Sequence, residues 1–152
     1  MRRFIPAFLL MLALAVPAGA VEGHVFKVLP QFLDLDGKES LTPSLYDRDA
    51  YQGVLRAHPE KRSGLRFAVQ WKVSFPKAPS RLLRVELRGV GPDGLPSKTT
   101  LELPLTTKHA FSHWEYLKLQ GDDYKKFGEM SAWRVTLWEG DKLLDEQKSF
   151  LW

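Results

Sequence analysis

The chain has 152 residues, with 22 Lys and Arg, 18 Asp and Glu, a formal net charge of +4 and no cysteine. Basic and acidic residues are interleaved, and no block of like charge forms a stripe that would follow a phosphate backbone, so we expect no nucleic-acid partner. The lack of cysteine excludes disulfide bonds as a source of stability.

A secretory signal peptide is predicted over residues 1–20. Two arginines precede an apolar run from Phe4 to Val16, and small residues at 18–20 provide a cleavage site. Thirteen apolar residues reach about 20 Å as a helix, short of the roughly 30 Å hydrocarbon core of a bilayer. We therefore favour cleavage before Val21 over a membrane anchor, with export to the periplasm or the exterior and no membrane span afterwards.

Cleavage would leave residues 21–152, enough for a single domain, with a net charge of +2 because two arginines are lost. The first elements expected in this domain are two short strands, His24 to Leu29 and Phe32 to Asp36. Pro30 separates them, as in an edge strand that switches from one sheet to another.

One helix is predicted near residues 43–58. Thr42 is the expected N-cap, Pro43 suits the first helical position, and Pro59 ends the helix. Apolar side chains at helical spacing form a stripe that we expect to dock on a sheet: Tyr46, Ala50, Tyr51, Val54 and Leu55. The other face carries Arg48 between Asp47 and Asp49, so it is either a salt-linked solvent face, which we favour, or a recognition face with Tyr46 and Arg48.

Strict apolar and polar alternation begins at Leu65. The run Leu65 to Phe75 predicts a half-buried strand at the centre of a sheet, with Trp71 in the core. Alternation at 83–88 and again at 98–105, across a Gly-Pro-Asp-Gly turn, predicts a hairpin.

The C-terminal part continues this period of two. His113 to Gln120 predicts a strand with Trp114 and Tyr116 opposite the leucines 117 and 119. Residues 133–137 and 142–151 predict a hairpin around Gly140, and the adjacent leucines 143 and 144 indicate a bulge or an edge position in its second strand. About seven short strands separated by turns predict a mainly β fold, an antiparallel β-sandwich with one inserted α-helix.

The segment Gly128 to Leu144 (GEMSAWRVTLWEGDKLL), followed by Ser149 and Phe150, resembles the last two strands of bacterial immunoglobulin-like or fibronectin-III-like domains. Tyr124 is similar to their tyrosine corner. This sequence departs from the antibody pattern because it has no cysteine pair and because Trp71 lies on the first long strand. The stretch Leu41 to Val73 also resembles uncharacterised exported bacterial proteins, which implies no activity.

Metal-binding patterns are weak. His109 and His113 are four positions apart, which in a strand separates them by about 13 Å. Asp34, Asp36 and Glu39 surround Gly37 without the spacing of a calcium loop, so we expect a turn there. We expect no metal and no cofactor.

Catalytic patterns are also weak. Ser63 lies outside any Gly-x-Ser-x-Gly elbow, and Asp122 with Asp123 indicates a turn or helix-cap pair before an acid/base dyad. We therefore expect no enzymatic activity.

The aromatic residues Trp114, Tyr116, Trp138 and Trp152 are the hardest to place in the core. On an outer sheet face they would stack on sugar rings or anchor a protein, unless the helix covers them. The function expected from the sequence is an exported, non-enzymatic binding or structural module of the bacterial cell envelope or exterior, with an unknown protein or carbohydrate partner. The alternative is a carbohydrate-binding module that uses Trp114, Tyr116 and Trp138. The candidate interaction surface consists of Tyr46, Arg48, Trp114, Tyr116 and Trp138.

Overall fold

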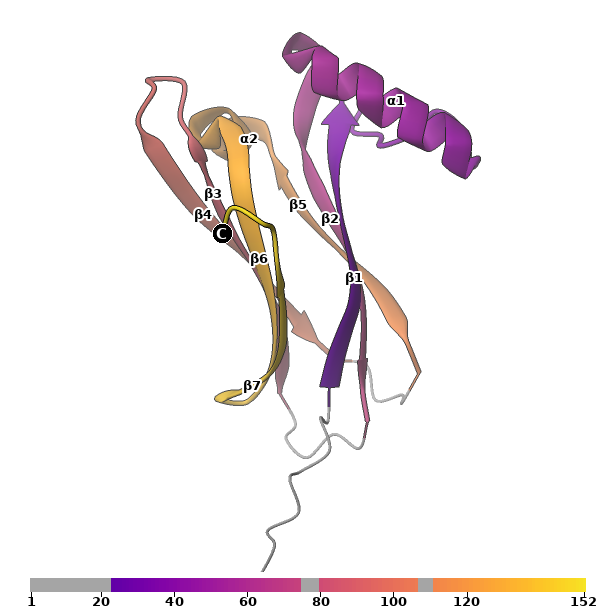
Figure 1. Cartoon of the computed structure of the whole chain (residues 1–152), viewed down its shortest axis with the longest axis vertical. Helices are drawn as coiled ribbons and strands as arrows, with labels where there is room; N and C mark the ends of the chain where they lie inside the picture. Colours follow the sequence, from indigo (N-terminus) through magenta and orange to yellow (C-terminus); the bar gives the residue numbers. More distant parts are fainter. Residues whose placement is uncertain (1–22, 75–79, 107–110) are drawn as a thin grey trace, which may run out of the picture.

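The computed structural model describes residues 23–74, 80–106 and 111–152. In these ranges seven strands form two antiparallel sheets, a three-stranded sheet β1-β2-β5 and a four-stranded sheet β4-β3-β6-β7, which Figure 1 shows as two layers. The predicted mainly β sandwich with an inserted helix is confirmed. The predicted signal peptide, its cleavage site, Phe75 and His109 lie outside the described residues. The strands are Gly23–Asp34 (β1), Arg62–Val73 (β2), Arg81–Val90 (β3), Pro96–Leu105 (β4), His113–Gln120 (β5), Glu129–Glu139 (β6) and Lys142–Lys148 (β7).

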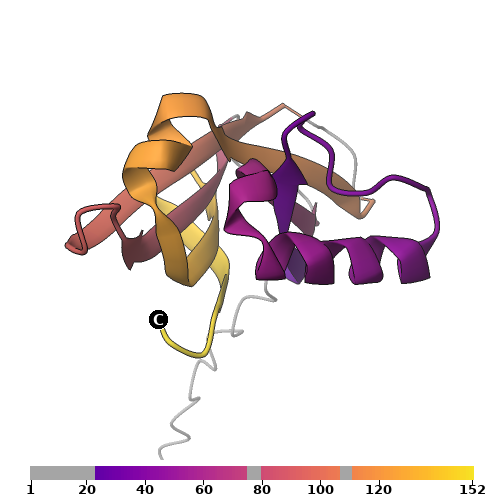
Figure 2. The same ribbon diagram turned by 90° about the horizontal axis from the view of Figure 1, so that it is seen from above.

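The connections between the described strands are of three kinds: hairpins, crossings from one sheet to the other, and a longer helical connection. The β3–β4 and β6–β7 pairs are hairpins, as predicted, whereas β2 to β3, β4 to β5 and β5 to β6 each pass between the sheets. Between β1 and β2 lie the helix α1 (Leu45–Ala57) and a short 3-10 turn η1 (Pro59–Lys61). Figure 2 shows α1 and a second helix, α2, over the same end of the sandwich.

Helix α2 (Gly121–Phe127) was not predicted from the sequence, because seven residues are too few to establish a helical period. It forms the β5 to β6 crossing and ends at Gly128, whose positive φ of 79° suits glycine. Asp122 and Asp123 lie in its first turn, where carboxylates interact favourably with the positive end of the helix dipole. The N-cap is Gln120, and no side chain of the described residues makes a cap hydrogen bond there, so the two aspartates are first-turn helical residues and not the turn or helix-cap pair that the sequence indicated.

The core lies between the two sheets. Trp71 is completely buried and packs among side chains that alternate along β2, β3 and β6, so the prediction of a central strand with Trp71 in the core is confirmed. Burial of this kind is the main source of stability in a domain without disulfides. The fully buried members on these strands include Phe67, Val69, Val73, Leu83, Val85, Val135 and Leu137.

The N-terminal region is one continuous strand, so the prediction of two short strands broken at Pro30 was wrong. Pro30 pairs with Phe67 in the middle of a ladder that runs from Gly23 to Asp34. Strand β1 has a hydrogen-bonded neighbour on one side only, and an edge strand is where a proline is tolerated in a sheet.

Side chains of β7 hold the first residues of β1. The Val25 N–H donates to Asp145 Oδ2 at 2.8 Å, and Gln147 Nε2 donates to the Val25 carbonyl at 2.6 Å. Gly23 lies so close to Leu144 that a Cβ on residue 23 would be 2.7 Å from Leu144 Cδ1. One side of the sandwich is therefore closed by side chains between two edge strands of different sheets.

Strand β7 is both an edge strand and bulged, as predicted from its adjacent leucines. Its register shifts by one residue between the pairs Leu137–Asp145 and Trp138–Leu143, which leaves Leu144 as the extra residue. The strand ends at Lys148, three residues before the predicted end.

The start of α1 differs from the prediction. The N-cap is Ser44, whose extended backbone lets its side chain accept the Asp47 N–H, and Pro43 precedes the cap. Thr42, the expected cap, donates its hydroxyl to Asp47 Oδ2 instead. Two residues of capping type flank Pro43, and the sequence offered no means of choosing between them.

The docked face of α1 also differs from the prediction. Leu55 is completely buried, but Tyr46 is 83% exposed, Val54 is 42% exposed and Ala50 also faces solvent. The helix is held by a polar side chain in place of the apolar stripe. Gln52 accepts the Phe32 N–H at 2.7 Å and donates to the carbonyls of Phe32 and Glu39, both at 2.9 Å.

The C-terminal end of α1 is held by a buried arginine of β2. The Arg62 guanidinium donates to the carbonyls of Leu55 and Arg56, which are among those left without partners at the end of the helix. It also makes a bidentate pair with Glu129 at 2.9 Å and lies 3.9 Å from the centre of the Phe32 ring. Helix α1 is thus attached to the sandwich by its C-terminal half, and its N-terminal half extends beside the three-stranded sheet.

Candidate functional site

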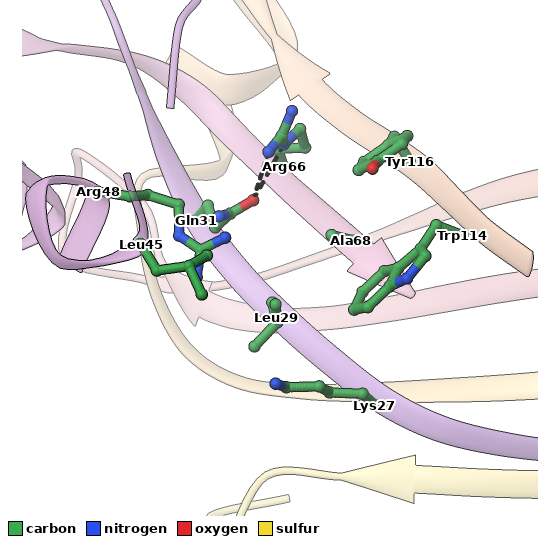
Figure 3. A pocket seen from close by; sticks show the side chains of 9 residues that line it. All are labelled: Lys27, Leu29, Gln31, Leu45, Arg48, Arg66, Ala68, Trp114 and Tyr116. Carbon is green, nitrogen blue, oxygen red and sulfur yellow. Dashed lines mark hydrogen bonds between the residues drawn. The ribbon is translucent and has the colours of Figure 1, made fainter. Parts of the chain in front are cut away.

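A groove of about 310 Å³ lies on the outer face of the three-stranded sheet (Figure 3). The strand registers explain which side chains meet there, because residues paired across β1, β2 and β5 point to the same side. One row across the sheet consists of Leu29, Ala68 and Tyr116. The adjacent rows are Lys27, Gln70 and Trp114 on one side, and Gln31, Arg66 and Lys118 on the other.

Small and large side chains give the groove its shape. Ala68, on the central strand, contributes only a methyl group to the floor, whereas Trp114 and Tyr116 rise from β5 on one side. Leu45 and Arg48 of α1 form the opposite wall (Figure 3). Trp114 is 39% exposed and Tyr116 is 50% exposed, so α1 stands beside these rings and does not cover them.

The groove is basic. Of the nine described residues that line it, Lys27, Arg48 and Arg66 are cationic and none is acidic. Arg66 is held in place: it donates to Gln31 Oε1 at 3.0 and 2.8 Å and pairs with Glu39 at 2.8 Å. Its guanidinium also lies 4.8 Å from the centre of the Tyr116 ring, a cation–π distance. The Arg66 charge is therefore already compensated by the protein.

The other two cations are much less compensated. Lys27 makes no ion pair with any residue in the described ranges. Arg48 Nε lies 3.6 Å from Asp49 Oδ1, a long contact to a carboxylate that is itself largely exposed and therefore weak. Lys27 and Arg48 are thus free to interact with a negative group in the groove.

The predicted interaction surface is only partly brought together. Arg48, Trp114 and Tyr116 line the groove, whereas Tyr46 lies on the outer side of α1 and is not part of the lining. Trp138 is on β6, on the outer face of the other sheet, where its Nε1 donates to Thr136 Oγ1 at 2.9 Å. A single platform of Trp114, Tyr116 and Trp138 is therefore not formed.

The remaining aromatic candidate also lies away from the groove. Trp152 is on the face that carries Trp138, with the guanidinium of Arg88 3.9 Å from its ring centre and that of Arg134 at 5.1 Å. The guanidinium of Arg84 lies 5.6 Å from the ring centre of Trp138, so both rings of that face have arginines of the four-stranded sheet beside them.

Two of the residues considered for metal binding and nucleophilic catalysis, His113 and Ser63, have structural partners. His113 faces the core, with its ring centre 5.7 Å from that of Trp71, and Ser63 Oγ donates to the Asp34 carbonyl. Over the described ranges, no group of three or more His, Cys, Asp or Glu side chains is arranged to hold a metal ion.

Asp34 forms the turn that was favoured over a calcium loop. Its Oδ1 accepts the N–H groups of Asp36 at 2.9 Å and Lys38 at 2.8 Å, and its Oδ2 accepts the Tyr51 hydroxyl at 2.8 Å. Burial works to raise the pKa of Asp34, but the hydrogen bonds from Lys38, Tyr51 and Asp36 outweigh it and hold the pKa below its usual value. Donating to this carboxylate, together with burial, raises the pKa of Tyr51.

Sequence reasoning missed six of the lining residues: Lys27, Leu29, Gln31, Leu45, Arg66 and Ala68. The alternation on β2 did predict that Arg66 and Ala68 face outward. Most outward-facing residues are simply in contact with solvent, so this position alone did not indicate a binding site. The missing signal was the register of β1, because the predicted break at Pro30 left the outward face of that strand undefined.

Comparison of the chain with protein-family models, with curated proteins and with solved structures finds no match. In the ranges that the structure describes, no helix combines the length and the apolar character needed to cross a membrane. The groove itself is therefore the basis for assigning a function.

Proposed function

We propose that this protein is an exported, non-enzymatic binding module of the bacterial cell envelope or exterior, and that its ligand lies in the groove on the three-stranded sheet. The observation that carries this proposal is the groove lining, in which two exposed aromatic rings face Lys27, which has no ion pair in the described ranges, and the weakly paired Arg48 across a floor of Leu29 and Ala68. Exposed aromatic and arginine side chains are the residue types that dominate binding energy at interfaces.

The N-terminal sequence supports export. Its charged start, short apolar run and small-residue site match a cleaved signal peptide. The mature protein is expected to begin at Val21, and N-terminal sequencing of the exported protein tests this. Exported protein that still contains Arg2 and Phe4 would exclude cleavage at this site.

We also infer that the sandwich is related to the immunoglobulin-like and fibronectin-III-like folds. Support comes from seven strands in sheets of three and four, with hairpins at β3–β4 and β6–β7 and three connections that cross between the sheets. Tyr124 departs from a tyrosine corner: it lies on α2, where burial raises its pKa and a hydrogen bond from Arg62 opposes the rise. Folds of this kind carry many activities, so the groove and not the fold supports the function.

A carbohydrate ligand is the more specific form of this proposal. Trp114 and Tyr116 are two positions apart on one strand, so their side chains lie on the same face and their backbone positions are about 7 Å apart along the strand. Rings presented in this way can stack on sugar rings. Trp138 has no part in this version, because it belongs to the other sheet.

A binding panel tests the proposal. The purified mature protein is applied to immobilised saccharides and peptides, in parallel with Ala68→Leu, which fills the floor of the groove, and with Trp114→Ala. The control is Lys98→Ala, an exposed change on β4 of the other sheet. We expect at least one bound compound whose binding both groove variants reduce and the control does not. A panel without any bound compound, or binding that neither groove variant changes, would contradict the proposal.

A further inference from the structure

We infer that the ligand of the groove is an acidic saccharide, a chain of sugar units that carry carboxylate groups. In this arrangement a sugar ring lies against Trp114 and its carboxylate is bound by Lys27 and Arg48. The inference rests on the proposed function, since it names the class of ligand for the same groove.

Charge favours an anionic ligand. Of the three cations in the lining, Arg66 already has Glu39 as its partner, whereas Lys27 has no ion-pair partner in the described ranges and Arg48 has only a long contact to Asp49. A carboxylate in the groove would therefore meet the positive charges of Lys27 and Arg48 and would displace at most the long Arg48–Asp49 contact. Charge-assisted hydrogen bonds to such groups are the stronger kind.

The hydrogen-bonding groups of the groove are mostly donors. The Gln31 side-chain oxygen is occupied by Arg66, which leaves the amide N–H of Gln31 as the group it can offer a ligand. Lys27, Arg48 and the Trp114 indole are donors only. A ligand that satisfies these groups must be rich in acceptors, and the hydroxyls and carboxylates of an acidic saccharide supply them.

The dimensions of the groove suit a ring that carries a charged substituent. Trp114 and Lys27 belong to one row across the sheet, with Gln70 between them, so their backbones are two strand spacings apart, about 10 Å. Both side chains border the groove from opposite sides (Figure 3). One sugar unit can therefore contact the aromatic ring while its carboxylate reaches toward the ammonium group.

The position of the groove disfavours an extended peptide. Peptides that add to a sheet are recognised through free main-chain groups at its edge. This groove lies on the face of the sheet, across β1, β2 and β5, and the backbone of β2 in its floor is paired on both sides. A ligand on this face therefore meets the side chains of the three strands first.

A nucleic acid is disfavoured by the charges around the groove. Binding of a single strand needs a positive track that continues along the backbone. Here Glu39 pairs with Arg66 and Asp49 contacts Arg48, so acidic side chains interrupt the run of basic ones along this face.

The test uses isothermal titration calorimetry with the mature protein and four acidic saccharides: oligogalacturonate, alginate oligomers, hyaluronan oligomers and oligomers of sialic acid. The matched neutral probe is methyl-esterified oligogalacturonate, which keeps the sugar backbone and masks the carboxylates. A poly-glutamate peptide supplies carboxylates without sugar rings. We expect binding to at least one acidic saccharide, weakened by added salt, and about tenfold or more weaker binding to an esterified form of that saccharide and to the peptide.

Four variants connect this binding to the groove. Lys27→Ala and Arg48→Ala are each expected to weaken binding of the acidic saccharide about five- to tenfold and to leave binding of its ester unchanged. Trp114→Ala is expected to weaken both. Lys98→Ala, the matched lysine change on the other sheet, is expected to change neither. A thermal melt of each variant shows that it is folded.

Three results would overturn the inference. The first is equal binding of the acid and its ester, the second is poly-glutamate binding as tight as any saccharide, and the third is no binding to any of the four acidic saccharides. After any of these results, the proposed function still stands if another compound of the saccharide and peptide panel binds the protein and its binding is weakened by Ala68→Leu. Only the class of ligand is then wrong. If nothing in either experiment binds, both proposals fail.

Discussion

The outer faces of the two sheets carry the same kinds of residue, but only one of them is left open. On the four-stranded sheet, the guanidinium of Arg84 lies 5.6 Å from the ring centre of Trp138, and those of Arg88 and Arg134 lie over Trp152. On the three-stranded sheet, Trp114 is exposed and has no guanidinium over its ring in the described part of the chain.

The registers account for this difference. On the four-stranded sheet, Arg84 is directly opposite Glu102 and Arg134 is directly opposite Glu86, and these pairs are ion-paired at 2.7 and 2.6 Å. Opposite charges in such cross-strand positions satisfy each other. On the three-stranded sheet, Lys27 is opposite the neutral Gln70. The outer face therefore stays open where a basic side chain, here Lys27, has no acidic residue paired with it on the next strand.

The largest predicted effect concerns the core that supports both faces. Trp71→Ala is expected to lower the free energy of unfolding by about 3–5 kcal/mol, because it removes a completely buried large side chain. Trp114→Ala, the matched change on the open face, is expected to cost about 1 kcal/mol or less. Chemical denaturation measures both. A melting midpoint unchanged by Trp71→Ala would contradict the burial of this side chain.

The next effect concerns the helix that forms one wall of the groove. Leu55→Asp is expected to destabilise the protein by about 2–4 kcal/mol, because it places a carboxylate at a completely buried position. Val54→Asp, one residue earlier on the exposed face, is expected to cost about 1 kcal/mol or less. Similar losses of stability in the two variants would mean that α1 docks through a different face.

The strands, the docked helix and the groove differ in how far they could be predicted from the sequence. The strands from Leu65 onward and the hairpin turns were predictable because few structures besides a half-buried strand produce a period of two over six or more residues. The docked face of α1 was not predictable, because the helix is held by Gln52 and Arg62. These residues are polar, and a search for an apolar stripe does not include them. The groove could not be predicted either, because its lining is set by the registers between strands whose paired residues are about 40 to 50 positions apart in the chain.

A smaller effect is expected from pH at the turn that leads into α1. The pKa of Asp34 is lowered in the folded protein, so its contribution to stability is fully present above the unfolded pKa of about 3.9 and is lost as the pH falls through the folded value. At neutral pH, Asp34→Asn is expected to cost about 1–3 kcal/mol, the range for hydrogen bonds to a charged group.

The matched measurement is the free energy of unfolding of wild type and of Asp34→Asn at acidic pH. The difference in unfolding free energy between wild type and Asp34→Asn is expected to shrink as the pH falls below the unfolded pKa and through the lowered folded pKa, because the carboxyl then becomes protonated. A difference that does not change with pH would show that the charge of Asp34 does not matter to the turn.

The smallest effect tests the contrast between the faces most directly. Arg134→Ala is expected to cost about 0.5–1 kcal/mol, because Arg134 pairs with Glu86 at 2.6 Å and with Glu146 at 4.0 Å on a partly exposed surface. Lys27→Ala is expected to change stability by less than that, since Lys27 has no ion-pair partner in the described ranges. Thermal or chemical denaturation compares them. A larger cost for Lys27→Ala would show that the groove face is internally satisfied after all.

The contacts of Val25 with β7 have a consequence for the order of folding. The partners Asp145 and Gln147 are 120 and 122 positions away along the chain, so this side of the sandwich cannot close until almost all of the described chain is present. Contacts between such distant residues form slowly, because the entropy of closing the intervening loop must be overcome first. A polypeptide crossing a membrane from its N-terminus would deliver β1 early and β7 last, and would complete its native structure only after translocation is nearly finished.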